Sequence, residues 1–94
     1  MGLSTIGNRF SLGQVVITRA AYGKLQQDDV QHNLVRHLNG DWGELNEFDW
    51  EQNALAVGNG GRLMSRYSTR SGTVYWIITE HDRSVTTILL PMEY

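Results

Sequence analysis

The sequence predicts an α+β domain in which two or three short helices pack on a small antiparallel sheet with a C-terminal three-stranded meander. Val30, Leu34 and Leu38 recur at every fourth position, the spacing of one apolar helix stripe. Polar and apolar residues instead alternate after residue 62, as in a half-buried strand, and short turn segments separate the alternating runs. Helical spacing early in the chain and alternation late in it together indicate the α+β class.

The N-terminal part of this domain is predicted to contribute one strand and one helix. Residues 1–9 show no periodicity, so we expect a flexible tail followed by a single domain over residues 10–94. Residues 14–18 form a β-branched run that favours a strand, which would join the sheet from the N-terminus. Residues 19–27 contain good helix formers, although Gly23 weakens that helix.

Two further helices are predicted on either side of a glycine-containing loop. Asp28 and Asp29 can cap the helix with the apolar stripe, because a carboxylate accepts hydrogen bonds from the first free N–H groups. Asn39 and Gly40 supply a C-terminal stop. A third helix is expected over residues 46–57, and its inward positions would be Phe48 or Trp50, Ala54 and Val57.

The last third of the chain predicts the meander. Residues 62–68 alternate, with Leu63, Ser65 and Tyr67 on one face. Residues 73–79 are rich in β-branched and aromatic residues, which suits a central strand, and residues 84–90 form the last strand before Pro91. Exposed edge strands of a small sheet often pair between subunits, so a homodimer is a further expectation.

Composition excludes several kinds of site. The chain has 94 residues, no Cys and a formal net charge of −2, so disulfides, thiolate metal sites and cysteine nucleophiles are excluded. We expect no metal and no cofactor, because the histidines are poorly spaced as ligands and no nucleotide-binding glycine motif is present. The absence of a long apolar run and of a signal-peptide pattern leads us to expect a cytoplasmic protein without a membrane partner.

One group of polar residues suits acid–base chemistry. His37 ends the second predicted helix at the edge of its apolar stripe, where a histidine serves either as a base or as a structural residue. Residues 80–83 (EHDR) crowd a turn, either as a catalytic cluster or as a solvated turn with weak ion pairs. Hydroxyls on neighbouring strands would line a polar concavity if they share one face. The candidate catalytic residues are His37, Arg66, Tyr67, Thr79, Arg83 and Thr86.

A second group suits protein recognition. Asp41 and Trp42 lie between Gly40 and Gly43, and several acidic residues follow them. An exposed Trp in such a loop would anchor a partner, whereas a buried one would complete the core. The candidate partner-binding residues are Asp41, Trp42, Glu44, Glu47 and Asp49.

Three segments of the chain resemble a family of short bacterial proteins from plasmids and integrative elements that carry labels such as plasmid-related protein. The segments are residues 36–43 (RHLNGDWG), 62–67 (RLMSRY) and 76–91 (WIITEHDRSVTTILLP), and the resemblance covers most of the chain from Phe10 onward. His81 stands where a small residue is expected. With the acidic bias and surplus aromatic residues, the resemblance leads to one hypothesis: an accessory protein of a mobile genetic element that binds another protein, for instance a host defence component.

The layout of the chain is also similar to the barnase–EndoU–colicin–RelE group of small RNases. A His-bearing helix precedes a strand with Ser and Tyr, and strands with Thr, Arg and Ser follow. This similarity implies a metal-independent endoribonuclease with RNA as its partner. His37 would be the acid or base, Arg66 and Arg83 would clamp phosphate, and Tyr67, Thr79 and Thr86 would position the substrate. Protein binding and RNA cleavage are therefore the two functional hypotheses.

Overall fold

The computed structural model describes residues 9–94. Of the expected tail over residues 1–9, all but Arg9 lies outside the described residues, and the Arg9 N–H donates to the Leu38 carbonyl at 3.0 Å. Among the helices of the described part, none combines the length and the apolar character that a membrane crossing requires.

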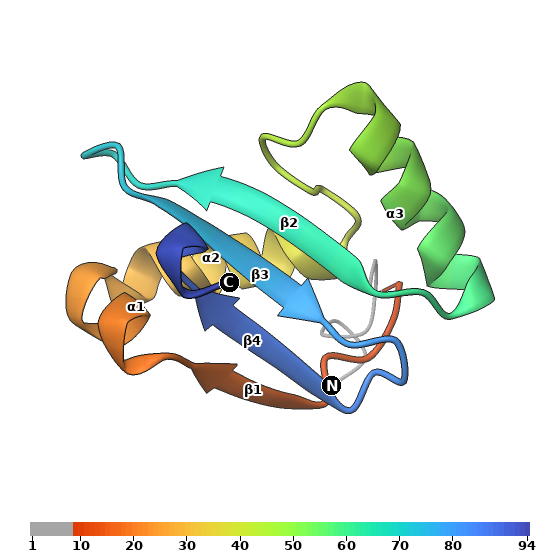
Figure 1. The fold of residues 1–94 in the computed structure, drawn as a ribbon, viewed down its shortest axis with the longest axis horizontal. Helices are drawn as coiled ribbons and strands as arrows, with labels where there is room; N and C mark the ends of the chain where they lie inside the picture. The colour runs from red at the N-terminus through yellow and green to blue at the C-terminus, as the bar shows by residue number, and fades with distance from the viewer. Residues whose placement is uncertain (1–8) are drawn as a thin grey trace.

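The described residues form one four-stranded sheet in the order β1-β4-β3-β2 (Figure 1). Its strands are β1 (Gln14–Ile17), β2 (Leu63–Ser68), β3 (Val74–Thr79) and β4 (Val85–Leu89). The pairs β2–β3 and β3–β4 are antiparallel, so the α+β class and the C-terminal meander are confirmed. β1 instead pairs with β4 in parallel, which makes the sheet mixed. A parallel neighbour needs a long crossover, and here every helix between β1 and the meander belongs to that connection.

The helices are α1 (Arg19–Lys24), α2 (Gln27–Leu38) and α3 (Glu47–Asn59), and a short 3-10 turn, η2 (Pro91–Glu93), follows the sheet. The Thr18 side chain caps α1, and the Asn46 side chain caps α3 by accepting from the Asp49 N–H at 2.8 Å. The cap predicted for α2 was wrong. Gln26 occupies that position without a side-chain bond, while Asp28 and Asp29 lie in the first turn, where their charge still favours the helix dipole.

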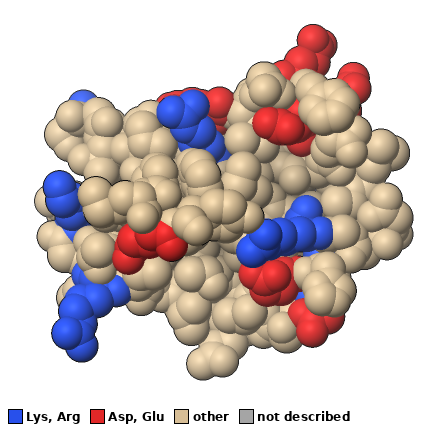
Figure 2. Space-filling model, in the orientation of Figure 1, with Lys and Arg blue, Asp and Glu red and all other residues tan. Residues whose placement is uncertain are grey.

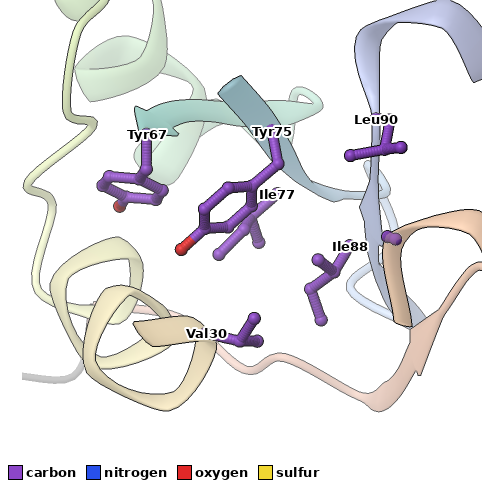
Figure 3. Packing of buried hydrophobic residues seen from close by; sticks show 7 residues of the cluster. Val30, Tyr67, Tyr75, Ile77, Ile88 and Leu90 are labelled. Carbon is purple, nitrogen blue, oxygen red and sulfur yellow. The ribbon is translucent and has the colours of Figure 1, made fainter. Parts of the chain in front are cut away.

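Two apolar clusters hold the layers together. The first fills the space between the sheet and the pair α1–α2, and Figure 3 shows Val30 of α2 beneath the sheet residues Tyr75, Ile77 and Ile88. The second lies where α3 packs against β2, and its buried members are Trp42, Ala56 and Leu63. Burial of these side chains supplies the main favourable contribution to folding.

The inward face of α3 differs from the predicted one. Trp50 and Val57 pack against the second cluster, whereas Phe48 is 66 % exposed and Ala54 is also exposed. Phe48 and Trp50 are two residues apart, about 200° around a helix, so both cannot face the sheet. The polar residue Asn53 takes an inward position instead, because its amide bonds the backbone N–H and C=O of Met64.

Candidate functional site

His37 lies at the centre of the polar residues that the sequence singled out. It occupies the last turn of α2, is 0 % exposed, and its ring lies on one face of the sheet, where it bridges side chains of β2 and β3. Its Nδ1 lies 2.5 Å from the Ser65 hydroxyl of β2, and its Nε2 lies 2.9 Å from the Thr79 hydroxyl of β3. Thr79 in turn lies 2.7 Å from Thr86 of β4. The expected sharing of one sheet face by these hydroxyls is thus observed.

The direction of these hydrogen bonds follows from their last acceptor. The Thr86 hydroxyl donates to the Leu12 carbonyl at 2.7 Å, and a carbonyl can only accept. Thr79 must therefore donate to Thr86, which leaves the Thr79 oxygen to accept from the Nε2–H of His37. Nδ1 of the ring then accepts from Ser65. We refer to Ser65, His37, Thr79 and Thr86 as the buried hydroxyl chain, and its order assigns His37 to the neutral Nε2–H tautomer.

Burial also keeps His37 uncharged. Desolvation, and to a smaller extent the positive charge of Arg83, together lower the pKa of His37 to about 3. A histidine with this pKa carries no proton charge near neutral pH, and both of its ring nitrogens are already engaged. The geometry provides neither a free base nor a free acid at this position.

Aromatic rings enclose the remaining sides of His37. Phe10 meets the imidazole edge-on with ring centroids 5.3 Å apart, and Trp42 does so at 5.4 Å. Phe10 and Trp42 also stack on each other at 6.1 Å. Ser65, Thr79 and Thr86 are each 0 % exposed. The polar concavity expected on this sheet face is therefore filled by the imidazole itself, and these hydroxyls are closed to solvent.

The segment RHLNGDWG forms a set of contacts that fixes the end of α2. Arg36 holds Asp41 through two hydrogen bonds of 2.8 and 3.2 Å, and it also donates to Asn33 at 3.0 Å. Its guanidinium lies 4.8 Å from the centre of the Tyr67 ring. The hydrogen bond from Arg36 lowers the pKa of Asp41, and the same bond raises the pKa of Arg36. Both side chains are partly exposed, so solvent screens this pair.

The next residues of that segment join the loop to the outer edge of β2. Trp42 is only 2 % exposed, and its carbonyl accepts from the Arg66 N–H at 3.1 Å. Gly43 has a φ of +77°, and a Cβ there would lie 2.1 Å from the Arg66 carbonyl oxygen. The Tyr67 hydroxyl donates to the Asp41 carbonyl at 2.6 Å, and burial raises the pKa of Tyr67. Tyr67 thus serves the packing of this loop.

Arg83 bonds to backbone carbonyls. Its Nη2 donates to the Ala56 carbonyl at 2.8 Å and its Nη1 to the Gly61 carbonyl at 2.5 Å, both at the end of α3. A cation at this position compensates the partial negative charge of the helix C-terminus. Its guanidinium also lies 5.7 Å from the centre of the Phe10 ring. These contacts occupy the group that was expected to clamp phosphate.

The other charged candidates lie apart from the buried hydroxyl chain. Arg66 is exposed, because neighbouring strand residues point to opposite faces and Ser65 already faces α2. In the charged turn, Glu80 approaches Arg62 at 3.5 Å, and the Ser84 hydroxyl lowers the pKa of Asp82 by donating to it. His81 is exposed in the same turn. The structure therefore does not bring Arg66 and the acidic side chains of the turn into one pocket with His37, and Arg83, whose charge acts on His37, is occupied by backbone carbonyls.

The partner-binding candidates divide into two groups. Asp41 is engaged by Arg36, and Trp42 is buried, so its indole offers no exposed anchor. Glu44 and Glu47 are exposed, and Asp49 is half-buried at the start of α3. Sequence reasoning missed the exposed apolar residues beside them, Phe48 at 66 % and Leu55 at 61 % exposure. Their seven-residue spacing was a usable signal, since it puts both side chains on one helix face.

A cleft of about 310 Å³ lies beside these residues, and it is lined by Glu44, Leu45, Asn46, Asp49, Met64, Arg66, Trp76 and Pro91. The indole N–H of Trp76 is buried and has no hydrogen-bond acceptor among the described residues. Within residues 9–94, no group of three or more His, Cys, Asp or Glu side chains is placed to hold a metal ion.

Comparison of the chain with protein-family models, with curated proteins and with solved structures gave no match.

Proposed function

We propose that this chain is a protein-binding module whose contact surface is the exposed side of α3 together with the loop before it. We call this surface the α3 face, and it consists of Glu44, Glu47, Phe48, Glu51 and Leu55. The observation that carries the proposal is the exposure of Phe48 (66 %) and Leu55 (61 %) beside acidic residues. Exposed apolar residues rimmed by polar ones are typical of protein interaction sites.

The charge around these anchors indicates the chemistry of the partner. Residues 41–61 contain five carboxylates and no Lys or Arg, and Asp41 alone among those carboxylates forms a salt bridge in the structure. Figure 2 shows acidic side chains gathered over α3 and the preceding loop. A partner would therefore offer an apolar pocket surrounded by Lys or Arg, and complementary charge would raise the association rate.

The cleft beside the α3 face adds a polar contact. Trp76 and Arg66 both line it, and the buried indole N–H of Trp76 lacks an acceptor among the described residues. An unpaired buried donor costs about 1–3 kcal/mol. A partner whose binding gives this indole N–H a carbonyl or carboxylate acceptor would recover this free energy, which favours an acceptor-rich segment near Trp76.

The resemblance to plasmid-related proteins gives this activity a biological setting. In that setting the chain would be an accessory protein of a bacterial mobile genetic element, and the partner would be a component of host defence. RNA cleavage has less support, because His37, Thr79 and Thr86 are each 0 % exposed and Arg83 is bonded to backbone carbonyls.

Affinity capture with matched variants tests the proposal. The tagged wild type and a Phe48→Ser, Leu55→Ser double variant are each used to retain proteins from a bacterial lysate, and the retained protein is purified for titration. We expect binding to weaken by at least about 30-fold in the double variant, the effect of losing about 2 kcal/mol at anchor residues. Val35→Ser on α2 is the control, since Val35 is also apolar and 57 % exposed. Equal binding by the double variant, or no retained protein with the wild type, would contradict the proposal.

A further inference from the structure

The two edges of the sheet differ in how their backbone groups are satisfied. On the outer edge of β2, the Arg66 N–H donates to the Trp42 carbonyl at 3.1 Å and its C=O accepts from Glu44 at 2.7 Å. The Asn53 amide bonds both the N–H and the C=O of Met64. The loop before α3 and the side chain of Asn53 thus close this edge against another strand.

β1 forms the opposite margin of the sheet, and within residues 9–94 no other strand pairs with its outer edge (Figure 1). The N–H groups of Gln14 and Thr18 donate inward to Ser84 and Ile88, both at 3.0 Å. Because backbone groups alternate along a strand, Val15 and Ile17 direct their N–H and C=O away from β4. Unpaired backbone groups of this kind can form hydrogen bonds with an additional strand.

The groove beside this edge is lined mostly by apolar residues, together with the uncharged Gln27 and Gln31. Val15 is 44 % and Ile17 is 36 % exposed. Both side chains lie on the sheet face that α1 and α2 cover, but at its margin, where the helices cover it less completely. They line a groove of about 420 Å³ with Tyr22, Leu25, Val30 and Leu34, and no charged residue contributes to it. Residues 11–18 also contain no charge and no Pro, the devices that commonly protect an exposed edge strand.

We propose that a second copy of this chain occupies the edge, with the β1 strands of the two copies paired antiparallel about a two-fold axis at Val16. In this register each Val15 lies opposite Ile17 of the partner subunit, and each such pair exchanges two backbone hydrogen bonds. A two-fold contact must be self-complementary, and an uncharged strand brings no like charges together at the axis. Two charges lie at the end of β1: the Glu93 carboxylate, which accepts from the Thr18 hydroxyl at 2.7 Å, and Arg19, which faces Gly13 of the partner subunit. The four residues of β1 themselves offer a charged partner protein no complementary charge.

Single-cysteine cross-linking tests this register, and the chain contains no native Cys. Two Val16→Cys residues would meet across the axis at about 4.5 Å between Cα atoms, within disulfide range. Gln14→Cys is the matched control on the same face of β1, because its copies would lie more than about 12 Å apart at 3.4 Å per residue. We expect oxidation to give a covalent dimer for Val16→Cys and a monomer for Gln14→Cys.

Sedimentation of the full chain gives the second measurement. For the wild type we expect twice the 10.7 kDa mass of the chain. For Val15→Pro we expect the dissociation constant of the dimer to rise at least about 10-fold. This substitution removes an outward N–H but no hydrogen bond to β4. Circular dichroism checks that this variant keeps its fold. A wild type that stays monomeric to about 200 µM would overturn the proposal. So would a dimer that survives Val15→Pro, or one that Gln14→Cys cross-links as readily as Val16→Cys.

Discussion

The His37 ring sits between two hydroxyls that fix its tautomer, inside a core that fixes its charge. Its pKa in the folded protein is about 3, whereas the ordinary value is 6.5. The unfolded chain therefore takes up a proton between these values and the folded chain does not. The contribution of His37 to the free energy of unfolding is therefore fully present above pH 6.5 and is lost as the pH falls toward 3.

This difference predicts a pH-dependent free energy of unfolding. Between about pH 6 and pH 4 the contribution of His37 falls by up to about 1.4 kcal/mol per pH unit. We expect His37→Gln to reduce the pH dependence by about this amount, because an amide keeps donor and acceptor but does not titrate. Urea unfolding at each pH measures it. His32→Gln, which replaces an exposed histidine of the same helix, is the control. Equal slopes for the wild type and His37→Gln would show that His37 is not held neutral.

At the level of elements, the loop of residues 40–46 determines how α2, α3 and β2 meet. Trp42 fills the second apolar cluster, and Gly43 allows the backbone to approach Arg66. The positive φ of Gly43 and the closeness of the Arg66 carbonyl both disfavour a side chain at this position. Residues 40–43, which include the partner-binding candidates Asp41 and Trp42, are therefore explained by their role in joining these elements.

Gly43→Ala is expected to lower the free energy of unfolding by more than about 2 kcal/mol, since alanine is strained at this φ and its Cβ would clash with Arg66 and Tyr67. Gly58→Ala is the matched control. Gly58 lies within α3 and a Cβ there meets nothing within 4 Å, so alanine should stabilise the helix by about 0.5–1 kcal/mol. Chemical denaturation of both variants measures the contrast. A loss below about 1 kcal/mol for Gly43→Ala would contradict the tight approach.

For the whole molecule, the two proposed surfaces lie at opposite margins of the sheet. The α3 face lies beyond β2, while the dimer edge is β1 at the other end of the strand order (Figure 1). We expect the Phe48→Ser, Leu55→Ser variant to remain dimeric and Val15→Pro to keep its partner, because distant substitutions act independently. Sedimentation and partner titration of both variants measure this. Loss of both activities in either variant would show that the surfaces are coupled.

Much of the fold could be predicted from local pattern. The alternation of Leu63, Ser65 and Tyr67 and the short turns identified β2 and the meander. The parallel pairing of β1 with β4 could not be predicted, because it joins residues about 70 positions apart and depends on the whole crossover. The choice between Phe48 and Trp50 as the inward aromatic also depended on where the preceding loop anchors α3.

The candidate site was predicted in composition but not in role. The sequence indicated that His37, Thr79 and Thr86 belong together, and the structure places them in one chain of hydrogen bonds. Whether such a group faces solvent or core depends on Phe10 and Trp42, which the sequence does not place over the imidazole. The exposure of Phe48 and Leu55 likewise follows from the orientation of α3, which is set by tertiary packing.

A ¹⁵N-resolved NMR titration of the His37 ring tests most directly whether this residue is structural. We expect a single neutral tautomer with the proton on Nε2, bonded to Thr79, and no uptake of a second proton above about pH 4. A ring that takes up a proton between about pH 6 and pH 7 would contradict its burial in the hydroxyl chain. A proton found on Nδ1 would contradict the order of that chain, and either result would make His37 a candidate acid or base again.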